Sequence, residues 1–349
     1  MDSRVARNRQ FLTDLYAGPF RGHGIVVDAE YLPDPDAHKV PFMERPLVEW
    51  VDLQIRQYEA RVEILDALDH DDVPVIRNFC GSATEIFAAA FGCQIHEYVD
   101  SNPVALPLVF TAEDADRLEV PSLDAPTLAR IFEAAALTRE KVGPDVPIGV
   151  CDIQSPFDVA ALIWHKQYMY MAMVDTPDAV KNLVDKCSTL LKNYLTEYAR
   201  AVGDCSYAHC PNTWGPPELG CWLSEDEAGA MNTTMFEEFC IPVLSDLSRT
   251  FGGMFIHCCA AADHQYQNFL KIPNLRGMNR VFQKPGPKPA IDAFSGTTVL
   301  MQAWMSVDEA IAMIDMAHPD TRFLFNLPAQ PLDESRRWYD RLREHCPRS

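Results

Sequence analysis

The spacing of hydrophobic positions changes near residue 70. Before it, a long helical pattern covers Leu47–Leu68 and prolines interrupt residues 33–46, so residues 1–70 are predicted to be helical and irregular. From Val73 onward, short apolar runs alternate with longer helical patterns. Short apolar runs between polar residues are typical of strands that are buried on both faces of a parallel sheet.

We interpret the apolar runs after residue 70 as strands and the segments between them as helices. One helix opens at Asp175-Thr176-Pro177 and repeats its apolar positions at i, i+3, i+4 and i+7. Capping boxes at Ser224–Glu227 and Ser306–Glu309 predict two further helix starts. The predicted strands are 73–78, 147–152, 205–209, 253–258, 275–279, 298–303 and 322–326.

Strands that alternate with helices favour parallel pairing with right-handed crossovers. We therefore predict an α/β protein, a (β/α)8 TIM barrel with an N-terminal helical extension. Residues 1–70 would form the extension, packed on the barrel, and residues 71–349 the barrel itself. A doubly wound open sheet is the alternative, but neither G-x-G-x-x-G nor a P-loop follows the first predicted strand.

Composition and net charge limit which binding partners and which cellular compartment we expect for this chain. The chain has 349 residues, is 48% hydrophobic and carries a net charge of -20, which argues against nucleic acid and anionic membranes as partners. The first residues are polar, unlike a signal peptide, and no apolar run approaches the roughly 18 residues of a membrane span. The 11 cysteines do not show the regular spacing of a small disulfide-bonded domain, so we expect a cytoplasmic protein with free thiols.

Polar and metal-binding residue types recur where the predicted strands end, which is where a barrel of this kind places its active site. Asp152 could bind substrate or orient a ligand histidine, and His209 with Cys210 could supply a metal ligand or ordinary hydrogen bonds. The full set is Asn78, Cys80, Cys151, Asp152, His209, Cys210, His257, Cys259, Asn279, Gln302 and Asn326.

The strongest single signal is the sequence Phe255-Ile256-His257-Cys258-Cys259. In a strand, side chains at i and i+2 point the same way, so His257 and Cys259 can reach one point while Cys258 faces away. An imidazole and a thiolate together suit zinc. The alternative is a core histidine beside a buried thiol.

Four segments resemble the uroporphyrinogen decarboxylase-like superfamily, which includes corrinoid-linked, zinc-dependent methyltransferases acting on thiols such as coenzyme M. The resemblance spans roughly residues 45–345, and its last segment lies where the methyltransferases have His-x-Cys-Gly. The segments are Val73-Pro74-Val75 leading to Ala90-Phe91-Gly92-Cys93, Ser155-Pro156-Phe157-Asp158-Val159-Ala160, Trp222-Leu223-Ser224 through Met235–Phe239 and Pro242, and Phe255–Cys259.

The chain departs from both branches of the superfamily. It lacks the Arg-Gln-Ala-Gly-Arg segment of the decarboxylases and their Asp after the first strand, so uroporphyrinogen is not the expected substrate. The methyltransferases take a third zinc ligand, a Cys, from the last strand, which here reads Phe325-Asn326-Leu327-Pro328. The third ligand would then be His209, Cys210, Cys151 or Cys80. Cys-Ala also replaces the Cys-Gly of the motif.

The resemblance implies methyl transfer between a corrinoid, that is a cobalamin, and a zinc-activated small thiol. We predict His257, Cys259 and Cys210 as metal ligands and Asp152 and His209 as catalytic residues. Substrate contacts are predicted at Asn78, Gln302 and Asn326.

No Asp-x-His-x-x-Gly motif is present, so a partner protein would carry the methylcorrinoid. A homodimer is also implied by the likeness. The alternatives are a metal-free decarboxylase or lyase acting on a small organic acid, with His257 or His209 as acid–base, and a non-catalytic ligand-binding barrel.

Overall fold

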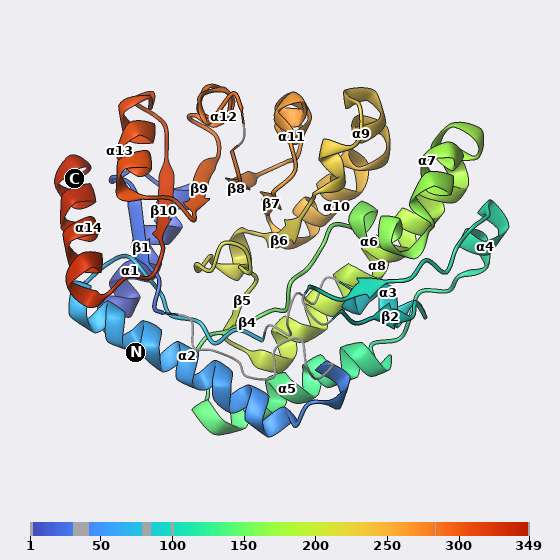
Figure 1. Cartoon of the computed structure of the whole chain (residues 1–349), viewed down its shortest axis with the longest axis horizontal. Coiled ribbons are helices and arrows are strands. Elements are labelled where there is room, and N and C mark those ends of the chain that lie inside the picture. Colours follow the sequence, from blue (N-terminus) through green and yellow to red (C-terminus); the bar gives the residue numbers. More distant parts are fainter. Residues whose placement is uncertain (1–2, 31–41, 79–84, 99–100, 283, 348–349) are drawn as a thin grey trace.

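The computed structural model describes residues 3–30, 42–78, 85–98, 101–282 and 284–347. Its strands form a curved row with helices on the outside (Figure 1). β7 (Met254–Cys258) and β10 (Phe323–Leu327) are largely apolar and buried along their whole length, because one face lines the lumen and the other packs on helices. The strands are β1 (Gly24–Val27), β4 (Ile148–Gly149), β5 (Cys205–Ser206), β6 (Cys221–Ser224), β7 (Met254–Cys258), β8 (Leu275–Arg280), β9 (Val299–Ala303) and β10 (Phe323–Leu327), with a separate antiparallel pair, β2 (Ile95–His96) and β3 (Val104–Ala105).

The strands pair in parallel to close a ring. One continuous sheet has the order β1-β10-β9-β8-β7-β6, and β4 pairs with β5. Isolated bridges join Gln154 to Ser224 and Ile76 to Ile148, and the amide of Asp71 donates to the carbonyl of Ile25 in β1. The predicted (β/α)8 TIM barrel is confirmed.

Helices predicted from periodicity agree with those observed. α2 covers Leu47–Leu68 as predicted, and the apolar positions expected in α8 are buried. The helices are α1 (Ser3–Ala17), α2 (Leu47–Leu68), α3 (Ile86–Ala90), α4 (Ala112–Arg117), α5 (Pro126–Val142), α6 (Pro156–Ile163), α7 (Lys166–Asp175), α8 (Pro177–Val202), α9 (Thr233–Phe239), α10 (Ile241–Phe251), α11 (Tyr266–Phe269), α12 (Lys288–Phe294), α13 (Val307–Asp315) and α14 (Leu332–His345), with the 3-10 turns η1 (Phe42–Glu44), η2 (Pro217–Leu219), η3 (Glu227–Gly229) and η4 (Asp263–Gln265).

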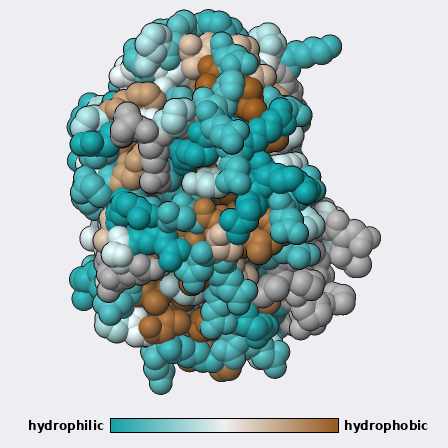
Figure 2. Space-filling model, turned by 90° about the vertical axis from the view of Figure 1, so that its left-hand side faces the viewer, coloured by the Kyte–Doolittle hydropathy of each residue, from teal (hydrophilic) through white to brown (hydrophobic). Residues whose placement is uncertain are grey.

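The face at the left of Figure 1, where α14 runs, is mostly hydrophilic with scattered hydrophobic residues (Figure 2). Among the described residues, no helix is both long and apolar enough to cross a membrane.

The sequence analysis missed two barrel strands, β1 and β6, as well as the separate pair β2 and β3. β1 lies within residues 1–70, so the segment predicted as a helical extension also contributes a barrel strand. Its four-residue run is too short to show a period. β6 was taken as the start of a helix, and the predicted capping box at Ser224–Glu227 is wrong, because Ser224 is in β6 and pairs with His257.

The connection from β5 to β6 runs back through the lumen. The hydroxyl of Tyr16, from α1, donates to the carbonyl of Trp214 at 3.2 Å. A Cβ on Gly215 would contact Trp222 and Phe255, whose rings stack 4.6 Å apart. Because this segment lies inside the barrel, it carries Cys210, at its upper end, to the lumen side of β7.

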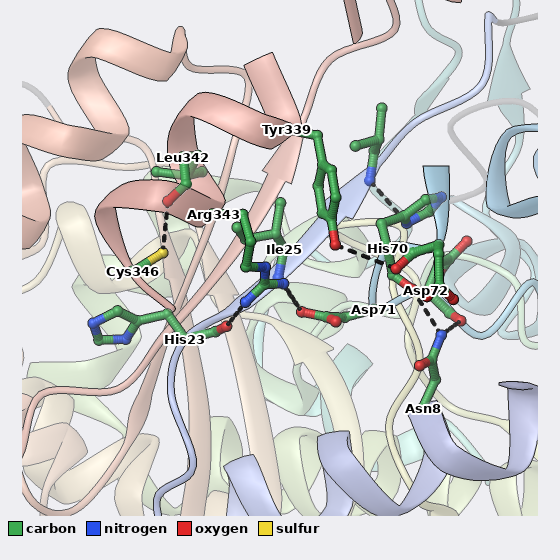
Figure 3. A network of polar contacts seen from close by, with 12 residues as sticks. Asn8, His23, Ile25, His70, Asp71, Asp72, Tyr339, Leu342, Arg343 and Cys346 are labelled. Atoms are coloured by element: carbon green, nitrogen blue, oxygen red, sulfur yellow. Dashed lines mark hydrogen bonds and ion pairs between the residues drawn. The ribbon is translucent and has the colours of Figure 1, made fainter. Parts of the chain in front are cut away.

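A polar network fastens both ends of the chain to β1 (Figure 3). The side-chain amide of Asn8, in α1, donates to the carbonyls of His70 and Asp72, each at 2.8 Å. Arg343, in α14, pairs with the buried carboxylate of Asp71 at 2.7 Å. The two terminal helices therefore bind the segment that runs beside the first barrel strand.

Candidate metal centre

Three side chains from two neighbouring strands meet at the carboxyl end of the barrel. His257 lies in β7, Cys259 follows that strand, and Asp226 follows β6. One ligand atom from each of the three lies within 4.8 Å of the others. His257 and Cys259 converge as their i, i+2 spacing predicts, and the pairing of Ser224 with His257 brings Asp226 beside them.

Hydrogen bonds fix which nitrogen of His257 is free. The side-chain nitrogen of Asn279 donates to the carbonyl of Met301 at 2.6 Å, so its oxygen faces Nδ1 of His257, 2.5 Å away. That oxygen only accepts, so Nδ1 carries the proton and Nε2 keeps its lone pair. Burial lowers the pKa of His257, which keeps the ring neutral, as a metal ligand must be.

The carboxylate of Asp226 and the thiol of Cys259 contact each other directly. Oδ1 of Asp226 accepts hydrogen bonds from the amide of Cys259 at 2.7 Å and from its thiol at 3.1 Å. Burial and the neighbouring carboxylate raise the pKa of Cys259 to about 12. The thiol proton therefore stays in place until a cation replaces it.

Asp158 holds the turn that presents Asp226. Its two carboxylate oxygens accept the amides of Asp226 at 2.7 Å and Glu227 at 3.1 Å, the role that the sequence analysis gave to Ser224. Burial, followed by the charge of Asp226, raises the pKa of Asp158 to about 7. Glu225 is buried beside it, and burial and the Asp158 carboxyl raise its pKa as well. Asp158, from the Ser155–Ala160 motif, thus holds the turn that carries the candidate ligand Asp226.

A buried guanidinium shapes the turn that presents Cys259. Arg280 donates to the carbonyls of Cys258, at 2.9 Å, and Ala260. Its Nη1 also lies 3.2 Å from the sulfur of Cys258, which confirms that Cys258 faces away from the cluster. Because both flanking carbonyls are held, Cys259 is fixed at the apex of the turn.

Cys210, predicted as the third ligand, lies at the other side of the His257 ring. Its sulfur is 3.4 Å from Nδ1, the protonated nitrogen, and burial raises its thiol pKa to about 12. The third donor near His257 and Cys259 is instead Asp226. The sequence analysis placed Asp226 inside a helix cap; its position just after an unrecognised strand was the signal that could have found it.

Asp152 and His209 form a pair beside this cluster. Oδ1 of Asp152 and Nδ1 of His209 lie 2.9 Å apart, and Nε2 of His209 is 3.3 Å from the carbonyl of Trp222. A carbonyl only accepts, so a hydrogen on Nε2 can point toward Trp222. The carboxylate of Asp152 therefore lies beside Nδ1 of a buried imidazole, close to the candidate metal centre.

Two of the three predicted substrate contacts face away from the lumen. The amide nitrogen of Asn78 donates to the carbonyl of Ile131 and the hydroxyl of Tyr198, on the outer helices α5 and α8. Gln302 is buried on the opposite face of β9 from Met301, whose side chain packs at Gly277 in the lumen. Gln302 lies near the end of β9, where the strand register turns it outward, whereas Asn78 follows an isolated bridge at Ile76 instead of the predicted strand.

Asn326 does lie in the barrel opening. Its side-chain nitrogen is 3.4 Å from the carbonyl of Asn212, in the segment that crosses the lumen. It also bonds Asp28, a carboxyl whose pKa burial raises to about 6. Of the other ligand candidates, Cys151 contacts the hydroxyl of Tyr194 at 3.3 Å in the core, and Cys80 lies outside the described residues.

The donor set fits zinc. It offers one imidazole nitrogen with a free lone pair, one thiol sulfur and one carboxylate oxygen. Three protein ligands that leave a fourth position open are the usual arrangement of catalytic zinc. Cys259 is exposed, so a small molecule can reach that position.

Replacing Asp158 tests how much the site depends on its supporting turn. Both carboxylate oxygens of Asp158 accept hydrogen bonds from backbone amides. Asp158→Asn replaces one of these oxygens with an NH2 group, which cannot accept, so the turn that carries Asp226 should loosen. Loss of such a supporting contact typically weakens metal binding about 10–100-fold. We expect that decrease in zinc affinity, measured by competition with a chromogenic chelator. Asp178→Asn, an exposed first-turn aspartate of α8, is the matched control, and equal affinities in both variants would contradict the role of Asp158.

Comparisons with known proteins agree with the barrel fold. A family profile described as uroporphyrinogen decarboxylase (URO-D) matches residues 64–278, which is more than half of the chain. No curated protein sequence matches the chain significantly. The solved structure of a methyltransferase from Methanosarcina mazei is similar, with a TM-score of 0.66 and 17% sequence identity over 97% of this chain and 98% of that chain. At this identity the likeness concerns the fold.

Proposed function

The chain belongs to the uroporphyrinogen decarboxylase family, and from that premise we propose that it is a zinc-dependent methyltransferase. It would move a methyl group between a corrinoid on a partner protein and a small thiol. The observation that carries this proposal is the convergence of His257, Cys259 and Asp226 at the open end of the barrel. The methyltransferase from Methanosarcina mazei, similar in fold, lends support.

The residues around the cluster have distinct tasks in this mechanism. Zinc held by His257, Cys259 and Asp226 would keep a substrate thiol as thiolate at neutral pH. Asn279 holds the imidazole in the ligand tautomer, with Nε2 free. The Asp152–His209 pair lies beside the cluster and would act as the base that takes up the proton of the substrate thiol.

The transfer itself is a displacement at the methyl carbon. A methylcorrinoid carried by a partner protein would supply the methyl group: the substrate sulfur would form the C–S bond as the Co–C bond breaks, and the electron pair of that bond would stay with cobalt. The thiol proton would leave before the transfer, and the Asp152–His209 pair would accept it. The reverse direction uses the same geometry.

A metal-free lyase acting on a small organic acid is the second candidate. The Asp152–His209 pair favours it, because an imidazole held by a carboxylate is a suitable acid–base group without any metal. The two candidates differ in their requirement for zinc. A chelator should abolish methyl transfer and leave a metal-free lyase unaffected.

Methyl transfer can be tested with free methylcobalamin in place of the partner-bound corrinoid. Zinc-loaded protein is incubated with methylcobalamin and either 2-mercaptoethanesulfonate or phenylmethanethiol, and the thioether is measured by mass spectrometry. We expect thioether to accumulate with the native chain and with Cys258→Ala, whose sulfur faces Arg280. With Cys259→Ala the rate should fall to that of the reaction without protein, because the candidate metal centre loses its sulfur ligand. Equal rates for the two variants, or no thioether from either thiol, would reject the proposal.

A further inference from the structure

Trp304 occupies an unusual position beside the candidate metal centre. It directly follows β9 at the open end of the barrel, and its side chain is 62% exposed. Its backbone is left-handed, with φ of 59°. A bulky side chain is a true outlier in that region, and such outliers concentrate at ligand clamps and active sites.

The chain on both sides of Trp304 holds it in this conformation. β9 is paired on both edges, with β8 and β10. Two residues after Trp304, Ser306 caps α13, and a full capping box joins it to Glu309. The strand end and the helix start are therefore both fixed, and the short link between them carries the exposed indole beside His257.

The indole stands edge-to-face with a metal-ligand ring. The ring centres of Trp304 and His257 are 6.3 Å apart, and their planes meet at 84°. A substituent on a thiol bound beside His257 and Cys259 would therefore lie within reach of the indole. The two carboxylates nearby already have partners, Asp226 with Cys259 and Asp152 with His209, so neither is free to receive a cationic group.

We propose that Trp304 is a specificity-determining residue that selects thiols carrying a flat aromatic group. The inference rests on the proposed function, because it assumes that a thiol binds at the metal. Ring pairs of this kind add binding beyond what apolar area alone supplies, by about 2–10-fold in affinity. The exposed indole is thus one wall of the substrate site rather than an unpartnered surface residue.

The test compares two thiols of similar size, phenylmethanethiol and cyclohexylmethanethiol, which differ in aromaticity. Calorimetry measures their binding to zinc-loaded native protein, Trp304→Phe and Trp304→Leu, with zinc content checked in each. Native protein should bind the aromatic thiol about 2–10-fold more tightly than the cyclohexyl thiol. Trp304→Phe should retain that preference, and Trp304→Leu should lose it with unchanged zinc content.

The outcomes separate the two proposals. If both thiols bind but Trp304→Leu keeps the aromatic preference, or the native chain has none, the role of Trp304 is overturned and thiol binding stands. If neither thiol binds any zinc-loaded variant, the thiol methyltransferase proposal fails and the inference fails with it.

Discussion

The His257→Ala/Cys259→Ala protein is expected to lose its zinc, whereas the native chain purified without chelators or a histidine tag should carry about one zinc per chain. The double substitution removes the imidazole and the thiol and leaves Asp226 as the single donor of the cluster. A lone carboxylate does not hold zinc against dilution and washing. Mass spectrometry of the metals in the purified proteins measures the difference, and methyl transfer should disappear together with the metal.

Single variants identify the third ligand. Asp226→Asn should lower zinc content, because the carboxylate is replaced by a weak donor. Cys210→Ala should keep the metal, since its sulfur lies at the protonated nitrogen of His257. The reverse pattern would restore Cys210 as a ligand. A native chain that takes up no zinc, even when zinc is supplied, would exclude the proposed mechanism and favour the metal-free lyase.

The second large effect concerns stability and involves a buried ion pair. Arg61, in α2, makes three hydrogen bonds to the carboxylate of Asp72, the shortest at 2.6 Å. Their side chains are 2% and 0% exposed. Arg61→Met leaves the Asp72 charge buried without its partner, so we expect the free energy of unfolding to fall by about 3–5 kcal/mol. Urea denaturation followed by circular dichroism measures this loss.

Two controls separate the buried charge from a general effect of the substitution. Arg200→Met breaks an exposed pair with Glu197 and should cost about 1 kcal/mol or less. The double variant Arg61→Met/Asp72→Asn should recover much of the loss, because no charge then remains buried. If Arg61→Met is no more destabilising than Arg200→Met, the pair does not stabilise the fold.

Much of the barrel could be predicted because helix and strand periods differ. The helix at Leu47–Leu68 and the capped start of α13 were found from apolar spacing and from one Ser–Glu pair, which are local properties. The two barrel strands that the sequence analysis did not predict were short. β1 spans four residues, and β6 follows a segment that crosses the lumen, an arrangement without a periodic signature.

Part of the candidate site could likewise be predicted from the sequence, and part could not. His257 and Cys259 could be paired from the sequence, because they are two residues apart at the end of one strand and local spacing sets their relative direction. Asp226 could not, because it reaches them only through the register of β6 against β7. Tertiary contacts also leave Asn78 bonded to the outer helices and turn Gln302, near the end of β9, away from the lumen.

The sequence by itself determined the order of helices and strands, the barrel that this order implies, and one two-residue metal-binding motif. Those features depend on spacing along the chain, which folding does not change. The tertiary structure decided which carboxylate joins the motif, how Asp158 and Arg280 hold its two turns, and that Trp304 faces the site. These are contacts between residues distant in sequence, and strand register and packing set them.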